Sequence, residues 1–126
     1  MLHYITIGTN DLTAAGAYYD PVMASLGFLR LSSEGELGYG PAGGKPQLWV
    51  VQPYNKIPAS WGNGTMIAIT APSRIAVDKF HAAGVVNGGF DEGGPGIRGG
   101  ADSNFYSCYV RDPAGNKLSA VHDQPV

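Results

Sequence analysis

The side chains that could do chemistry in this sequence are few and far apart. There are three histidines, His3, His81 and His122, and a single cysteine, Cys108. A divalent metal site with open positions typically needs imidazole, thiolate or carboxylate ligands that converge in space. His81 falls in a helical stretch and His122 at the end of the last strand, so both are interpreted as packing or surface residues. His3 is interpreted as a strand-edge or terminal residue, and as a metal ligand it would have no partner carboxylate.

The other reactive groups do not suggest a catalytic site. The acidic residues fall on expected helices, turns, loops or the tail: Asp11, Asp20, Glu34, Glu36, Asp78, Asp91, Glu92, Asp102, Asp112 and Asp123. Cys108 is expected to face a helix as a buried apolar residue. Ser119 has no facing histidine that could act as its base. Tyr4 or Tyr109 could act as an acid only if its pKa were lowered.

Another group of residues suits the binding of a small molecule. Aromatic and thioether side chains alternate with hydroxyls on the expected strands, which is typical of a pocket for a flat or partly apolar ligand. The expected ligand-binding residues are Tyr4, Thr6, Trp49, Met66, Tyr109, Arg111 and Ser119. Arg111 and Arg98 could meet an anionic group of the ligand. Alternatively, Trp49 and Met66 fill a core, and Arg111 and Lys117 form a solvated hairpin end.

The pattern of apolar residues predicts the elements that position these side chains. Alternating runs predict strands, and stretches that follow a capping residue predict helices. The expected strands are residues 4–7, 28–31, 37–40, 47–51, 66–70, 105–111 and 117–122, and the expected helices are residues 12–26 and 73–86. Pro21 is expected to kink or split the first helix.

The order of these elements repeats. A shift of 62 residues lays residues 4–7 on 66–69 and Tyr18 on Phe80. A longer shift is needed to lay residues 48–49 on 118–119, and the extra length fits a glycine-rich loop expected at residues 93–100. Order is a stronger test of a repeat than identity. The sequence therefore predicts one domain of two βαβββ modules, residues 1–55 and about 64–126, with a linker at residues 56–63.

Two motifs resemble a known superfamily. The opening Tyr-Ile-Thr-Ile-Gly-Thr-Asn-Asp-Leu and the closing hairpin Tyr-Val-Arg-Asp-Pro-Ala-Gly-Asn-Lys-Leu are similar to those of the vicinal oxygen chelate superfamily. That superfamily includes glyoxalase I, bleomycin and fosfomycin resistance proteins, and extradiol dioxygenases. The resemblance covers essentially the whole chain. It implies an α+β fold in which a curved mixed sheet forms a ligand cup with two helices outside.

The resemblance also implies where a metal would bind. Metal-using members take ligands from four strands, typically His or Gln on the first strand of each module and Glu on the last. Carried over, these positions fall on Tyr4, Trp49 (with Val51 as the alternative), Met66 and Ser119. None of these is a usual ligand for zinc, iron, nickel or manganese. We therefore expect no metal and no cofactor.

Strand alternation separates the residues that face the helices from those that face the cup. The apolar set is expected to face the helices: Ile5, Ile7, Leu48, Val50, Ile67, Ile69, Cys108, Val110, Leu118 and Ala120. The spacing to Asp11 in the family favours Tyr4 over His3 on the cup side. A slip of one residue would turn the other side chain inward.

Composition limits the partners. Charged residues make up 14% of the sequence, the net charge is −2, and the basic residues are scattered, so a nucleic-acid partner is not expected. No apolar run approaches the length of a membrane span, and the start lacks a signal-peptide pattern, so a cytoplasmic protein is expected. One cysteine rules out an internal disulfide framework. Open sheets with free edges favour a homodimer.

Two functions remain open. The first is a small-molecule-binding protein with a degenerate, metal-free site, whose ligand is aromatic or amphipathic. The alternative is a metal-dependent lyase or dioxygenase of glyoxalase type that uses a site not identified from the sequence. The absence of carboxylates from the expected cup favours the first, and whether the protein is an enzyme stays open.

Overall fold

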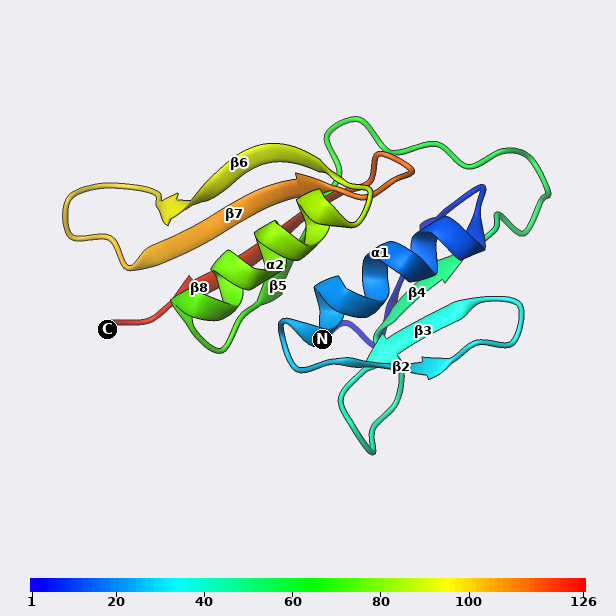
Figure 1. Ribbon diagram of the computed structural model, residues 1–126, viewed down its shortest axis with the longest axis horizontal. Helices are drawn as coiled ribbons and strands as arrows, with labels where there is room; N and C mark the ends of the chain where they lie inside the picture. The colour runs from blue at the N-terminus through cyan, green and yellow to red at the C-terminus, as the bar shows by residue number, and fades with distance from the viewer.

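The computed structural model describes residues 1–126 and contains two modules with the same order of elements (Figure 1). The first comprises β1 (Ile5–Gly8), α1 (Leu12–Ala24), β2 (Leu29–Ser32), β3 (Leu37–Gly40) and β4 (Leu48–Val51). The second comprises β5 (Met66–Thr70), α2 (Arg74–Val86), β6 (Phe90–Ile97), β7 (Phe105–Arg111) and β8 (Lys117–Asp123). The predicted α+β fold of two βαβββ modules is confirmed.

Each module forms its own four-stranded mixed sheet. The strand order is β1-β4-β3-β2 in the first and β5-β8-β7-β6 in the second. In both, the first strand pairs in parallel with the last, and the other pairs are antiparallel. Both sheets are open, so they have free edges and do not close into a barrel.

The helices α1 and α2 pack against each other and cover one face of the two sheets (Figure 1). The core lies between the helices and the sheets. The helix-facing residues are buried at Ile7, Leu48, Val50, Cys108, Val110, Leu118 and Ala120, and partly buried at Ile5, Ile67 and Ile69. The predicted alternation is therefore confirmed.

The opposite face of the sheets, which we call the open face, carries the alternate residues of the same strands. Its residues include Thr6, Trp49, Val51, Met66, Ala68, Thr70, Ser107, Tyr109, Arg111, Lys117, Ser119 and Val121. No helix of the chain covers it, and on β5 its side chains are exposed. No helix in the structure has the length and apolar character needed to cross a membrane.

Helix α1 differs from the expectation at Pro21. The helix continues from Leu12 to Ala24 with Pro21 inside it, so of the two predicted effects, a kink or a split, the split is wrong. Tyr19 and Val22, on either side of the proline, are fully buried. Tertiary packing of this face outweighs the one amide hydrogen bond that proline removes.

The glycine-rich segment is also different from the prediction. Residues 93–97 are not a loop but belong to β6, an edge strand that pairs with β7. The ladder needs only backbone groups, and its register shifts on both sides of Gly93 absorb the irregular segment. The loop between β6 and β7 is therefore shorter, at residues 98–104.

Residues in the turn between β7 and β8 form hydrogen bonds that link the two modules. Asp112 in this turn is 1% exposed, and its carboxylate accepts hydrogen bonds from the backbone N–H groups of Ala114 and Asn116, both at 2.9 Å. It also accepts from the Asn116 amide at 2.8 Å and from the Tyr19 hydroxyl of α1 at 2.6 Å. The Asn116 amide donates in turn to the carbonyl of Gly8 at 2.9 Å. This contact fixes the second module against β1 and α1.

Candidate functional site

Three strands of the second module bring several predicted binding residues together on the open face. Ser119 of β8 lies opposite Tyr109 of β7. One row away, Lys117 lies between Met66 of β5 and Arg111 of β7. Directly opposed residues have their Cβ atoms about 4.5–5.5 Å apart. The sheet therefore gathers aromatic, thioether, hydroxyl and basic groups within one small area.

Ser119 is unusual on this face because its hydroxyl has no partner. The residue is 1% exposed, and its Oγ makes no hydrogen bond. Its two cross-strand neighbours, Tyr109 and Ala68, offer no base. A buried hydroxyl without a partner is unfavourable. The Ser119 hydroxyl is therefore an unsatisfied buried polar group between Tyr109 and Ala68, and it is not arranged as a nucleophile.

On the open face of the first module, Trp49 lies between Thr6 and Gly38 in the sheet register. A Cβ on Gly38 would come within 2.8 Å of Cζ3 of the Trp49 ring and within 3.0 Å of Pro46. Glycine at this position therefore leaves the space in which the indole lies against β3. Trp49 stays half-buried, and Thr6 is exposed.

An apolar cavity of about 610 Å³ lies between the facing edges of the two modules. Eleven of its fifteen lining residues are hydrophobic, so it suits an apolar group. Tyr4 and Met66 line it, as does His3, whose ring contacts that of Tyr4 edge-on at 5.6 Å. The other predicted binding residues are not in its lining and lie on the open sheet faces. They are Thr6, Trp49, Tyr109, Arg111 and Ser119.

A second hollow of about 760 Å³ lies beside the linker. Only three of its eleven lining residues are hydrophobic. Val51, the alternative family position on β4, lines this hollow and not the apolar cavity. Its polar lining does not suit the flat, partly apolar ligand expected from the sequence.

Arg111 already has several partners within the protein. Its guanidinium forms an ion pair with Glu92, donates to the carbonyl of Gly115 at 2.7 Å, and lies 5.2 Å from the centre of the Trp61 ring. Sequence reasoning missed Glu92 and Trp61, because it placed Glu92 in a turn or loop and Trp61 in the linker. Recognising residues 90–97 as a strand would have revealed the first.

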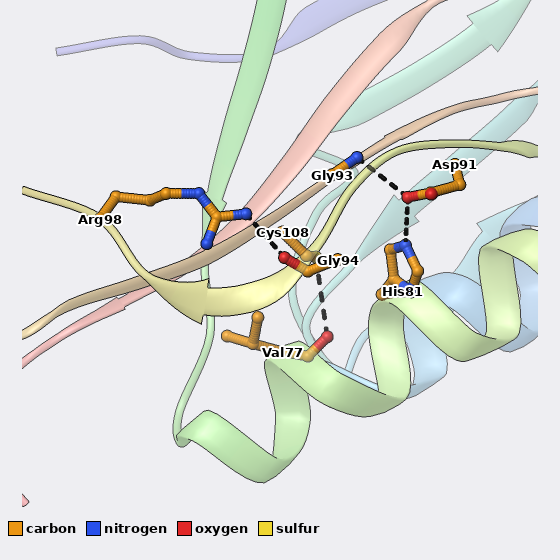
Figure 2. A network of polar contacts seen from close by, with 7 residues as sticks. All are labelled: Val77, His81, Asp91, Gly93, Gly94, Arg98 and Cys108. Atoms are coloured by element: carbon orange, nitrogen blue, oxygen red, sulfur yellow. Dashed lines mark hydrogen bonds and ion pairs between the residues drawn. The ribbon is translucent and has the colours of Figure 1, made fainter.

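The remaining reactive groups lie on the helix side of the second module (Figure 2). His81 Nε2 is 2.8 Å from the carboxylate of Asp91, which also accepts the N–H of Gly93 at 2.9 Å. These two hydrogen bonds, chiefly the one from His81, lower the pKa of Asp91. Burial raises the pKa of Cys108, whose Sγ lies 3.7 Å from the carbonyl of Val77. The thiol is therefore inert, as its helix-facing position predicted.

The side chains present do not fit a divalent metal centre. The family positions carry a phenol, an indole, a thioether and a hydroxyl, at Tyr4, Trp49, Met66 and Ser119. Nowhere in the chain do three or more His, Cys, Asp or Glu side chains converge in a way that could hold a metal ion. His3 lines the apolar cavity without a carboxylate beside it.

Comparison with known proteins identifies the family through structure. No family model matches the sequence, and no curated protein sequence matches it. The chain is 36% identical to a glyoxalase/bleomycin resistance protein from Albidiferax ferrireducens T118, with a TM-score of 0.84 over 94% of this chain and 96% of that one.

Two more distant structures share the fold. A glyoxalase/bleomycin resistance protein/dioxygenase family enzyme from Burkholderia phytofirmans PsJN is 19% identical, with a TM-score of 0.72 over 98% of each chain. Lactoylglutathione lyase from Agrobacterium tumefaciens is 22% identical, with a TM-score of 0.61 over 96% of this chain and 92% of that one. At 36% identity over nearly the full length of both chains, the first of the three relatives settles the assignment: this chain belongs to the glyoxalase/bleomycin resistance protein family.

Proposed function

We propose that this protein binds a small organic molecule on its open face and does so without a divalent metal. The proposed contact residues are Thr6, Trp49, Met66, Tyr109, Arg111 and Ser119 on the open face, together with Tyr4 in the lining of the apolar cavity. The observation that carries the proposal is the type of side chain at the four positions where relatives bind a metal: none of them is a carboxylate or an imidazole. Aromatic rings with a few hydroxyls suit a flat aromatic or amphipathic ligand.

The proposal includes a homodimer. Each sheet has free edges, and the open face is not covered by any element of the same chain. A second copy could complete the cup over exposed side chains such as Tyr4 and Met66. Light scattering at micromolar concentration should give the mass of two chains; the 13.2 kDa of one chain would contradict this part.

The test of binding is a ligand screen followed by titration of Trp49→Ala. The half-buried indole should supply much of the apolar contact, so its removal should weaken binding by roughly 1–3 kcal/mol. Tyr54→Ala is the matched control, because Tyr54 is a fully exposed aromatic residue that lines the polar hollow beside the linker, where none of the proposed contact residues lies. Binding that is unchanged in Trp49→Ala would place the ligand elsewhere.

Elemental analysis and metal titration distinguish the alternative, a metal-dependent lyase or dioxygenase. We expect no stoichiometric zinc, nickel, iron or manganese in the purified protein. About one equivalent of metal that is lost in His3→Ala would reject the metal-free site and favour the enzyme. We also propose a cytoplasmic location, which the single buried thiol is compatible with.

A further inference from the structure

Two basic side chains lie against the same ring on the open face. The guanidinium carbon of Arg98 is 5.4 Å from the centre of the Tyr109 ring, and the Lys117 ammonium is 5.5 Å from it. Neither side chain forms an ion pair with a carboxylate, although both are half-buried. Both cations therefore lack a counter-charge, and partial burial weakens the screening of their positive charge by water.

The local sequence holds Arg98 in this position. Arg98 directly follows β6, and its guanidinium donates to the carbonyl of Gly94 at 2.6 Å, so the side chain folds back along β6 (Figure 2). A Cβ on Gly96 would lie 2.9 Å from Arg98 Nη1, and a Cβ on Gly93 would lie 3.0 Å from the Tyr109 ring. The glycines of β6 therefore leave the space that the guanidinium and the ring occupy.

The charge around Tyr109 is unbalanced. Arg111, the cross-strand partner of Lys117, is neutralised by Glu92, and this leaves Arg98 and Lys117 without a counter-charge. Asp123 shares the alternation of Lys117 but lies at the opposite end of β8. The protein as a whole has a net charge of −2, so this positive area is a local feature and not a general excess of basic residues.

We infer that the ligand of the open face carries an anionic group, a carboxylate or a phosphonate, that is bound by Arg98 and Lys117 beside Tyr109. The inference rests on the proposed binding function and adds the ligand class, an aromatic or apolar molecule with one anionic end. The anion would supply the counter-charge that Arg98 and Lys117 lack. The unpartnered Ser119 hydroxyl, directly opposite Tyr109, supplies a further hydrogen-bond donor.

The experiment compares three small probes: phenylphosphonate, benzoate and the neutral benzyl alcohol. Backbone amide NMR shifts report binding at the open face for the wild type, Arg98→Gln and Lys117→Gln. Lys79→Gln is the matched control, because Lys79 is an exposed cation on α2, on the other side of the sheet. Gly96→Ala serves as a second variant. The added methyl group would shift the guanidinium of Arg98 from its position without changing the charge of the protein.

We expect one or both anionic probes to shift the Tyr109 and Ser119 amides, and Arg98→Gln and Lys117→Gln each to weaken that binding roughly fivefold or more. Gly96→Ala should also weaken it, whereas Lys79→Gln and the binding of benzyl alcohol should be unaffected. Comparing the affinity for phenylphosphonate with that for benzoate shows whether the site prefers a phosphonate or a carboxylate.

Equal binding of neutral and anionic probes, insensitive to both charge removals, overturns the anion site and leaves the binding function standing. Failure of all three probes to perturb the open face at millimolar concentration overturns both. Anion binding that is lost equally in Lys79→Gln is non-specific and also overturns the site.

Discussion

Asp112 is the residue whose removal should most clearly weaken the contact between the modules. Asp112→Ala removes an acceptor of four hydrogen bonds and leaves the hydroxyl of Tyr19, which is 0% exposed, without a partner. Hydrogen bonds to a charged group contribute about 1.5–3 kcal/mol each, and an unsatisfied buried hydroxyl costs about 1–3 kcal/mol. These contributions are not additive. We expect the free energy of unfolding to fall by about 3–5 kcal/mol.

Smaller changes at the same contact give graded effects. Asp112→Asn keeps one carbonyl oxygen for the turn and should cost about 1–3 kcal/mol. Tyr19→Phe removes one donor and should cost about 1–2 kcal/mol. Once Asp112 has been changed to alanine, Tyr19→Phe should cost much less, because the hydroxyl no longer has an acceptor. Asp123→Ala, at the exposed end of β8, is the control and should stay within about 0.5 kcal/mol of the wild type.

The assay is urea unfolding followed by tryptophan fluorescence and far-UV circular dichroism, with each variant analysed for its midpoint and slope. A loss below about 1 kcal/mol in Asp112→Ala would refute the account of the carboxylate as the main polar link between the modules. The same conclusion would follow if Tyr19→Phe cost as much without the carboxylate as with it. Asp112→Asn keeps the test informative if Asp112→Ala does not fold.

Three further predictions follow from burial and steric contacts. Burial raises the pKa of three tyrosine hydroxyls, Tyr18, Tyr19 and Tyr39. Their contribution to stability is full below about pH 10, the ordinary tyrosine pKa, and is lost as the pH rises further; urea midpoints that stay constant up to about pH 11 would contradict this. The buried thiol of Cys108 should react with a chromogenic disulfide reagent slowly in buffer and rapidly in denaturant, and equal rates would be inconsistent with its burial. Gly115→Ala should destabilise by about 1–3 kcal/mol, because φ is +91° and the added Cβ would lie 2.6 Å from Trp61; Gly94→Ala, with open space around it, is the control, and equal unfolding midpoints would refute the steric argument.

Much of the local structure follows directly from the sequence. Alternation of apolar residues separated the helix-facing side of β5 and β8 from the open face, because successive side chains of a strand point to opposite sides. Asp11 and Ser73 begin the two helices, and the carboxylate or hydroxyl of each accepts an N–H of the first turn at 3.0 Å. The positive φ of Gly115 likewise agrees with its place in the turn between β7 and β8, since glycine has no Cβ to oppose that conformation. Each of these features depends on neighbours within a few residues.

Other features depend on residues that are far apart in the chain. The sequence predicted a kink or a split at Pro21, whereas packing of Tyr19 and Val22 keeps α1 in one piece. Pairing with β7 turns the expected loop at Gly93 into a strand.

The open face shows the same division between sequence and fold. Its residue types were predicted from strand alternation, but which of them have partners was not. Arg111 pairs with Glu92 and lies near the Trp61 ring, whereas Arg98 and Lys117 lie against the Tyr109 ring and have no carboxylate partner. The hydrogen bond between Tyr19 and Asp112 spans 93 residues of sequence. Local patterns fix the direction of each side chain, but its partners come from other strands and from the other module, and only the packed tertiary structure brings them within contact distance.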